Sequence, residues 1–483
     1  MDMRVDPIPE MSSTDTYRDA KRYVWLIYPL WMLTPIVGVA LGLQTGNAAW
    51  FWLTPVLLFI VMPILDLVLG INTKNAPEES EERLDSDPYY RYVVRFTVVL
   101  HFVALFLGAW AVGTHAFGWL DYTAVALSCG LISAWGIVTA HELGHKKGAL
   151  DRWLSKIVLA TGAYGCYMTD HNAGHHRDIA TPEDSGSSRF GENLYYFLVM
   201  RQVPHSAFVR PWQLEKARLA RSGKGPWSLE NQVVYSALVT LLLYGGLIAV
   251  FGVTVVPYLF VVAFISFFFL GFIDYIEHYG LLRQKRPDGR YERVRPGHSW
   301  NTDHVATNVI YLHAQRHSDH HAYPTRRYQV LRHFPNLPTM PTGYPGMYWL
   351  CIFPPLWRAV MDPILLKLHD HDLNRINIDP AKRDALFAKY SRVPDKSKVP
   401  APIGHDEACA PTSAAHVSVA SKSYQCPCPG CGYTYREAVG DPAQGFPAGT
   451  PWSRIPASWS CPDCAVRDKV DFVELSPDRV AVP

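Results

Sequence analysis

The sequence lacks several features that would assign it to a common class of protein. Its 45 Lys and Arg nearly balance its 43 Asp and Glu, so the net charge of +2 gives no reason to expect a nucleic-acid partner. No G-x-G-x-x-G occurs, so we expect no nucleotide site in this chain. The first apolar block follows a polar, acidic N-terminus and has no small-residue cleavage site, which argues against a secretory signal peptide.

Charged residues are scarcest in six apolar blocks that lie before about residue 276. Each block has roughly 20 residues, enough to cross a hydrocarbon core of about 30 Å. Apart from Asp66, Arg95 and His101 the blocks hold few ionisable side chains, whereas a transporter or metal sensor would place such groups inside its spans. We therefore expect membrane spans near residues 24–43, 49–71, 94–113, 122–140, 233–253 and 256–275.

Lys and Arg are distributed unevenly between the connections. They are missing from the connections at 44–48, 114–121 and 252–255. They are frequent at 17–22, 72–93 and 146–232 and again after 280. By the positive-inside rule, both termini and all the long loops are expected in the cytoplasm.

Histidines are abundant, and their spacing is informative. "TAHELGHKKG" places His141 and His145 one helical turn apart on one face, as metal coordination requires. "TDHNAGHHRD" and "QRHSDHHAYP" repeat this arrangement, and "DYIEHYG" places His278 at the membrane depth of His141. Nine clustered histidines exceed the need of one tetrahedral zinc, whereas two irons with four or five ligands each would use them all. The candidate ligands are His141, His145, His171, His175, His176, His278, His317, His320 and His321.

Acidic residues accompany these clusters. Taken alone, HELGH is the signature of a zinc metalloprotease with Glu142 as general base. Acids beside ligating histidines can instead accept the second imidazole N–H and fix the tautomer, or bind iron directly. The candidates for this role are Glu142, Asp170, Glu277 and Asp319.

The C-terminus contains a second candidate metal site. "CPCPGCGYTY" and "SWSCPDC" carry paired C-x2-C knuckles, Cys428 with Cys431 and Cys461 with Cys464. On the reducing side of a membrane, metal binding is favoured over disulfides. The spacing fits a tetrahedral four-thiolate site for either zinc or iron, so a zinc ribbon for partner recognition stays open at this point.

The histidine motifs HELGHK, HNAGHH, IEHYG and LHAQRHSDHHAYP, in this order behind six apolar blocks, resemble the integral-membrane alkane 1-monooxygenase family. The resemblance covers roughly residues 20–390 and implies a non-haem diiron centre held by the nine histidines, with O2 as co-substrate. Asp170 departs from the family pattern, in which Glu is expected. Desaturases share the HxxxH and HxxHH skeleton, so a fatty-acyl desaturase or hydroxylase is the alternative function.

The residues around the cysteines resemble rubredoxin, an iron protein with four thiolate ligands and one-electron chemistry. The motifs are YQC, GYTY, GDPAQGFPAGTPW, IPASW, CPDC and DFVEL, with Tyr424, Tyr435, Trp459 and Phe472 expected to pack the small core. Cys426 departs from the pattern, because two extra residues separate it from the C-G step. We expect Cys428, Cys431, Cys461 and Cys464 to bind the iron, since Cys428 closes the usual C-x2-C-G knuckle.

The expected fold is mostly α, a six-helix transmembrane bundle with a cytoplasmic histidine-rich catalytic region and a small β-rich rubredoxin domain. The domains are the membrane hydroxylase at 1–394, a flexible linker at 395–422 and rubredoxin at 423–483. The resemblances imply terminal hydroxylation of medium- or long-chain alkanes in the bacterial inner membrane, with electrons from the chain's own rubredoxin. An external NAD(P)H-dependent flavin reductase is the expected partner. The sequence assigns no substrate-binding residue.

Overall fold

The computed structural model describes residues 17–287, 289–390, 422–428, 431–456, 459–464 and 467–475. The chain is mostly helical with one small sheet near its C-terminus, as the sequence predicted. The predicted linker lies outside the described residues, except for Lys422.

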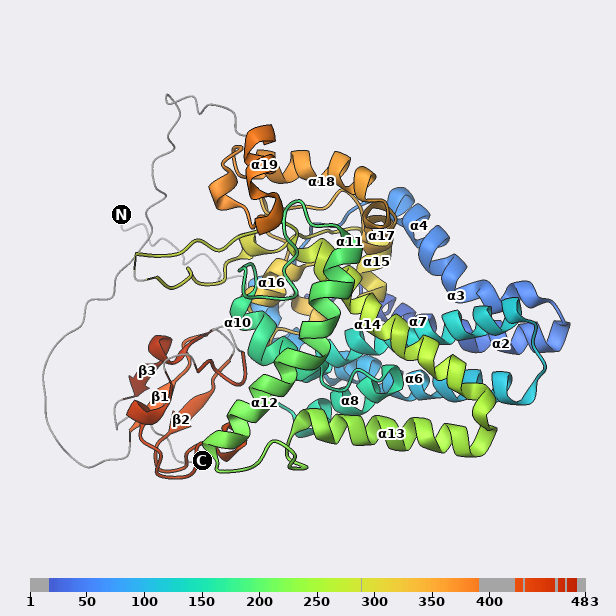
Figure 1. Cartoon of the computed structure of the whole chain (residues 1–483), viewed down its shortest axis with the longest axis horizontal. Helices are drawn as coiled ribbons and strands as arrows, with labels where there is room; N and C mark the ends of the chain where they lie inside the picture. The colour runs from blue at the N-terminus through green and yellow to red at the C-terminus, as the bar shows by residue number, and fades with distance from the viewer. Residues whose placement is uncertain are drawn as a thin grey trace, which may run out of the picture.

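Helices form where the sequence is most apolar (Figure 1). Five helical stretches are long and apolar enough to cross a bilayer. They are Ala48–Leu69 (including α3, Leu53–Val56, and α4, Met62–Leu69), Pro88–Thr114 (α6), Trp119–Gly144 (α7), Gln232–Phe251 (α13) and Val253–His278 (including α14, Val256–His278). Each coincides with one of the six predicted blocks.

The first predicted block is not one straight helix. Val24–Met32 (including α1, Ile27–Met32) and Thr34–Thr45 (α2) meet at a bend of 50°. Pro35 stands at the start of α2. Because proline has no backbone N–H, it cannot continue the hydrogen bonding of the preceding helix, which explains the break.

A second bent pair was not predicted from the sequence. Tyr344–Ile352 (α17) and Pro354–Leu368 (α18) are together apolar enough to span but meet at 119°. The described residues therefore contain between five and seven spans by length and composition.

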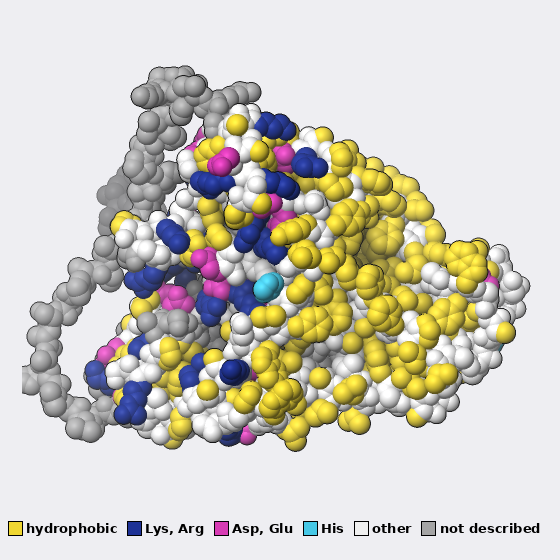
Figure 2. Space-filling view, in the orientation of Figure 1, with side chains coloured by type: hydrophobic (Ala, Val, Ile, Leu, Met, Phe, Trp, Pro, Cys, Tyr) yellow, Lys and Arg dark blue, Asp and Glu magenta, His cyan; other side chains and the backbone are white. Residues whose placement is uncertain are grey.

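The helix α7 lies at the centre of this bundle. It packs against α6 and α14, and 89% of its most apolar window is buried, compared with 11% for α13. Figure 2 shows hydrophobic side chains covering one part of the molecule, while charged side chains gather at the other end. The shorter helices are α5 (Glu81–Ser86), α8 (Ala149–Leu159), α9 (Tyr167–Asp170), α10 (His176–Asp178), α11 (Leu194–Tyr196), α12 (Arg210–Arg221), α15 (Val305–Ile310), α16 (His317–Ala322) and α19 (Arg383–Tyr390).

The C-terminal region forms a three-stranded sheet in the order β2-β1-β3. The central strand β1 (Ser423–Gln425) is antiparallel to β2 (Thr434–Arg436) and to β3 (Val473–Leu475). The predicted aromatic core is confirmed: Tyr424, Tyr435 and Trp459 are buried together with Phe446 and Ile455, and Phe472 packs against them.

Candidate metal centres

The structure brings all nine predicted histidines together, in two groups. In each group one ring nitrogen per residue lies within 4.8 Å of those of the others. Eight of the nine side chains are buried, and His141 is half-buried. The first group is His141, His145, His171, His176 and His320, and the second is His175, His278, His317 and His321.

The five-histidine group depends on a local change of helix type. His141 and His145 lie one turn apart where α7 ends. Between α9 and α10, the segment His171–His175 is a π-helix. Because a π-turn repeats at i→i+5, residues five apart share a face, and the Nε2 atoms of His171 and His176 lie 3.0 Å apart. The Nε2 of His320, from α16, lies 3.2 Å from that of His176.

The four-histidine group takes residues from the same π-helix and from α16. His175, the last residue of the π-turn, belongs to this group together with His278 at the end of α14. His317 and His321 lie one turn apart on α16, with their Nε2 atoms 2.8 Å apart. The Nε2 of His278 is 3.2 Å from that of His317.

These nitrogens lie close enough together that they could bind metal ions. Two facing Nε2 atoms at 2.8–3.2 Å can share only one proton, so at least one nitrogen of each pair keeps a free lone pair. A cation placed among these nitrogens would bind to the free lone pairs. Burial lowers the pKa of His171, His176 and His320 well below its usual range, which favours the neutral, ligating form. Imidazole suits iron as well as zinc, but five histidines exceed the four ligands of a structural zinc site.

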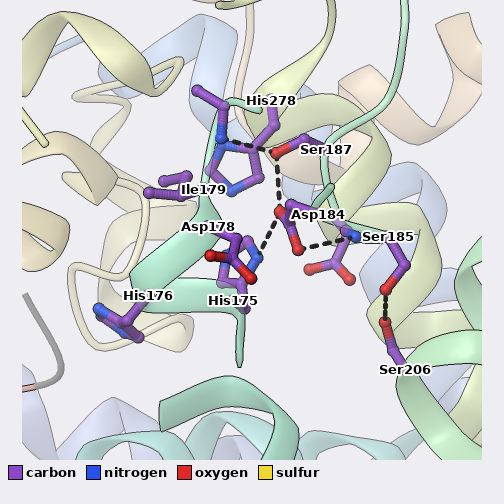
Figure 3. Close-up of polar contacts among 12 residues, drawn as sticks. His175, His176, Asp178, Ile179, Asp184, Ser185, Ser187, Ser206 and His278 are labelled. Atoms are coloured by element: carbon purple, nitrogen blue, oxygen red, sulfur yellow. Dashed lines mark hydrogen bonds and ion pairs between the residues drawn. The ribbon is translucent and has the colours of Figure 1, made fainter. Parts of the chain in front are cut away.

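A buried aspartate that the sequence analysis did not identify orients His175 (Figure 3). Asp184 Oδ2 lies 2.9 Å from His175 Nδ1 and also accepts a hydrogen bond from Ser187 Oγ at 2.7 Å. Arg210 donates to the other oxygen, Oδ1, at 3.0 Å. A carboxylate on Nδ1 leaves Nε2 free to face the group.

The electrostatics of this pair follow from the geometry. Burial alone would lower the pKa of His175, but the Asp184 carboxylate raises it to about 9. Burial alone would raise the pKa of Asp184, but His175 and Arg210 hold it well below its usual range. The Asp184 carboxylate therefore favours a proton on His175 Nδ1, which leaves Nε2 as the nitrogen that could bind a metal. The only sequence signal of this pair is an acid shortly after HNAGHH, which does not distinguish Asp184 from its acidic neighbours.

The four predicted acids do not all contact imidazoles. Glu277 does, because its Oε2 is 3.1 Å from His317 Nε2, and its other oxygen accepts a hydrogen bond from the Tyr344 hydroxyl. The other three acids pair with basic side chains. Glu142 lies 3.2 Å from Lys146, Asp170 lies 3.4 Å from Arg210, and Asp319 lies 2.7 Å from Arg326.

A cavity reaches both groups. His141 and His171 from the first group and His175 and His317 from the second contribute to its wall. The rest of the wall includes the apolar side chains of Ile137, Val138, Leu270, Ile273 and Ala314 and the acidic and aromatic side chains of Asp274, Glu277, Tyr167, Tyr311 and Tyr344. An apolar molecule in this cavity would lie directly against the histidine groups.

The closest group of four sulfurs differs in one member from the predicted set of ligands. The four sulfurs that lie within 4.8 Å of one another belong to Cys426, Cys431, Cys461 and Cys464. Cys428, which we predicted as a ligand, is also buried, but it is not a member of this group. Cys426 directly follows β1, and its N–H donates to Tyr433 O at 2.9 Å, so the strand pairing directs Cys426 into the site.

Comparisons with known proteins give matches over both parts of the chain. The family model "Fatty acid desaturase" matches residues 117–350, and the family model "Rubredoxin" matches residues 423–472. The chain is 44% identical over 380 residues to "Alkane 1-monooxygenase" of Ectopseudomonas oleovorans, covering 79% of this chain and 94% of that protein. It is also 44% identical over 384 residues to "Alkane 1-monooxygenase 1" of Alcanivorax borkumensis, covering 79% and 95%.

The C-terminal part has a relative of its own. It is 63% identical over 48 residues to "Rubredoxin-2" of Alcanivorax borkumensis, covering 10% of this chain and 28% of that protein. The chain belongs to the alkane 1-monooxygenase family and carries a rubredoxin domain at its C-terminus.

Proposed function

We propose that the chain inserts one oxygen atom of O2 into the terminal C–H bond of a medium- or long-chain alkane, at a diiron centre held by its two histidine groups. The second oxygen atom leaves as water, which requires two electrons and two protons for each alcohol formed. The main support is the cavity, because it combines an apolar wall with histidines from both groups.

The two groups differ in the donors they offer. One iron would be held by the five-histidine group, and the other by His175, His278, His317 and His321. Iron bound at these nitrogens would supply the activation of O2. Glu277 lies at the edge of the four-histidine group, where the Tyr344 hydroxyl fixes its orientation. Asp184 holds the ring of His175 in one tautomer, so that its Nε2 faces the site.

Electrons would arrive through the rubredoxin domain. A four-thiolate iron carries one electron at a time, so two transfers are needed for each turnover. We propose Cys426, Cys431, Cys461 and Cys464 as its ligands. A separate flavin reductase that uses NAD(P)H would reduce this iron. A linker of about 28 residues has a reach of about 30 Å and keeps the carrier at about millimolar effective concentration.

The domain limits and the membrane orientation are part of the same proposal. The hydroxylase domain would comprise residues 1–394, the linker 395–422 and the rubredoxin domain 423–483. Because Lys and Arg concentrate in the long loops, the histidine groups and both termini would face the cytoplasm, with the chain in the bacterial inner membrane.

A desaturase is the second candidate, because the matching family model is that of fatty acid desaturases. Desaturases form a double bond, so the product separates the two functions. A zinc metalloprotease is disfavoured by the contacts of Glu142. Its carboxylate lies 3.2 Å from Lys146, a pairing that does not suit a general base.

Metal and product analysis on the purified protein tests the proposal. We expect three irons per chain and a primary alcohol from an alkane supplied with O2, reductase and NAD(P)H. His278→Ala should lose both iron and alcohol, because it removes a ligand of the four-histidine group. His304→Ala is the matched control, since His304 belongs to neither group and its Nδ1 instead contacts Thr302 Oγ1 at 2.6 Å. Active protein with zinc at the histidine groups would refute the proposal, and an alkene product would favour the desaturase.

A further inference from the structure

Aromatic side chains connect the four-histidine group with the helix α1. The ring centre of Tyr344, on α17, lies 5.0 Å from that of Tyr311, which directly follows α15. The ring centre of Trp135, on α7, lies 4.7 Å from that of Tyr311 and 5.3 Å from that of Trp31 on α1. All four side chains are buried. We call these four residues, in the order Tyr344, Tyr311, Trp135 and Trp31, the ring series.

A carboxylate joins the first member of the ring series to the four-histidine group. The Tyr344 hydroxyl donates a hydrogen bond to Glu277 Oε1, and Glu277 Oε2 lies 3.1 Å from His317 Nε2. A phenol gives up an electron much more readily when a neighbouring base takes the phenolic proton in the same step, because no acidic phenol cation is then formed. Glu277 is positioned to act as that base toward Tyr344.

Packing alone does not require the residue types of the ring series. A buried phenylalanine packs as well, and Phe269 does so with its ring centre 4.9 Å from that of Trp135. Tyrosine and tryptophan are much easier to oxidise than phenylalanine, and the ring series contains only these two residue types. Because its neighbouring ring centres are at most 5.3 Å apart, electrons can pass from ring to ring much faster than an enzyme turns over.

The last member of the ring series lies away from the reacting groups. Tyr344 and Tyr311 contribute to the wall of the cavity, whereas Trp135 and Trp31 do not. Trp31 belongs to the apolar stretch Val24–Met32, and its neighbour Leu30 is 58% exposed on a helix expected to lie in the bilayer. An oxidised Trp31 would therefore stand apart from the histidines and close to reductants dissolved in the membrane.

We propose that the ring series removes oxidising equivalents from the histidine-bound centre when O2 has been activated and no alkane is in place. Tyr344 gives one electron to the centre and its phenolic proton to Glu277. An electron from Trp135 then passes through Tyr311 to Tyr344, which takes its proton back from Glu277. Trp31 restores Trp135 in the same way and remains a radical cation until a quinol of the bilayer supplies one electron. The inference rests on the proposed function, because that function supplies the oxidant.

The position of the oxidised ring tests the ring series in the full-length, iron-loaded chain. The reduced protein is mixed with O2 without alkane and without quinol, and is frozen rapidly for EPR. Preparations that carry ring-deuterated tryptophan or ring-deuterated tyrosine show which residue type holds the radical, because deuteration narrows its signal. Tryptophan radicals react with O2, so mass spectrometry of peptides from a parallel sample identifies the tryptophan to which oxygen has been added.

We expect a tryptophan radical in the original chain and oxygen added at Trp31. An excess of alkane should remove most of both signals, because hydroxylation then consumes the oxidant. Trp135→Phe should replace the tryptophan radical by a tyrosine radical, since it interrupts the ring series after Tyr311. Trp31→Phe loses no hydrogen bond, because Trp31 Nε1 has no partner among the described residues. It should move the added oxygen to Trp135 and leave the initial rate of alcohol formation unchanged.

Trp25→Phe is the matched control for Trp31→Phe. Trp25 is also buried, and its Nε1 also lacks a partner in the described part of the chain. Its ring packs against His313 and Tyr328, which lie outside the ring series. This variant should keep the tryptophan radical and the oxygen added at Trp31. Trp227, whose side chain is 79% exposed, reports any attack by a diffusible oxidant.

Three results would overturn the ring series in a chain that makes alcohol from an alkane. These are the absence of a tryptophan radical, an unchanged radical in Trp135→Phe, and added oxygen that does not move in Trp31→Phe. Oxygen added mainly at Trp227 would also overturn it, because a diffusible oxidant would then explain the damage. A chain that makes no alcohol would instead overturn the proposed function and the inference with it.

Discussion

Replacing Asp184 by Asn removes one negative charge from the surroundings of His175 and changes little else. Asp184 is fully buried and accepts hydrogen bonds from His175 Nδ1 at 2.9 Å, Ser187 Oγ at 2.7 Å and Arg210 Nη1 at 3.0 Å. An asparagine has the same shape, but its amide group donates where one carboxylate oxygen accepted. At least one of these donors therefore loses its partner.

The size of the effect follows from these contacts. A hydrogen bond to a charged group is worth about 1.5–3 kcal/mol, so the loss of one or two predicts a destabilisation of about 1.5–6 kcal/mol. Arg210 keeps Asp170 and Asp178 as partners, which prevents a larger loss from an unpaired buried cation. The pKa of Asp184 is held below its usual range, so its stabilisation is fully present above the unfolded pKa of about 3.9 and is lost only in acid. Assays at neutral pH therefore measure the whole effect.

The larger consequence concerns metal binding. Loss of a carboxylate that orients a ligating histidine typically lowers metal affinity or activity about 10- to 100-fold. Asp184→Asn should therefore lose iron from the four-histidine group first, because His175 belongs to that group. Iron is measured after dialysis against a chelator, thermal unfolding gives the stability, and product analysis gives the rate of alcohol formation.

Asp178→Asn is the matched control for this variant. Asp178 also forms ion pairs with Arg210 and lies 2.7 Å from Arg177, but its carboxylate makes no hydrogen bond to a histidine among the described residues. It should lose some stability and keep its iron. If Asp184→Asn retained full iron and full activity, or if both variants lost iron equally, the proposed orientation of His175 by Asp184 would be wrong.

Three further predictions concern the other contacts. Cys426→Ser should bleach the red colour of the oxidised rubredoxin and Cys428→Ser should spare it, and the reverse pattern in the absorption spectrum would restore Cys428 as the ligand. Tyr344→Phe removes the hydroxyl that donates to Glu277 and should slow alcohol formation about tenfold with little loss of stability. An unchanged rate of alcohol formation would show that this hydrogen bond does not matter for turnover. Deleting all residues after 394 should leave the membrane domain folded and loaded with two irons but unable to use electrons from the reductase. High concentrations of added rubredoxin should restore its activity. Full activity with the reductase alone would refute the electron route.

The clustering of the histidines could be predicted because their spacing alone indicates a shared helix face. Pairs such as His141 and His145 stand four residues apart, and this spacing brings two imidazoles together on one face of a helix. The division into five and four could not be predicted, because it depends on the π-turn at His171–His175. With α-helical geometry, His171 and His175 would be expected on one face, whereas the structure places them in different groups.

The contacts of the acids depend on tertiary structure, which the sequence pattern does not contain. Asp170 and Asp319 stand beside histidines in the sequence, yet Arg210 and Arg326 approach them from other parts of the chain. Asp184 stands nine residues from His175, and a loop returns it to the ring. Proximity in sequence therefore identified Glu277 as a neighbour of an imidazole and missed Asp184, while Glu142, Asp170 and Asp319 contact basic side chains.

The choice between Cys426 and Cys428 shows a similar limit. A C-x2-C-G spacing is the usual knuckle, and it favoured Cys428 from sequence alone. The backbone register favours Cys426 instead, because Gln425 pairs with Thr434 and the N–H of the next residue, Cys426, donates to Tyr433 O. Strand pairing is a contact between distant residues, so local spacing could not reveal it.

The two histidine groups are held relative to each other by the same short helices. The segment from α9 to α10 supplies His171 and His176 to one group and His175 to the other. Among the described residues neither group includes an Asp or Glu, and the rings of His176 and His321, one from each group, have their centres 4.4 Å apart. The separation of the two groups is therefore fixed by backbone geometry and by packed imidazoles, without a carboxylate shared between them. One residue inserted in the π-turn would rotate histidines of both groups at once, so such an insertion is expected to disrupt both proposed metal sites.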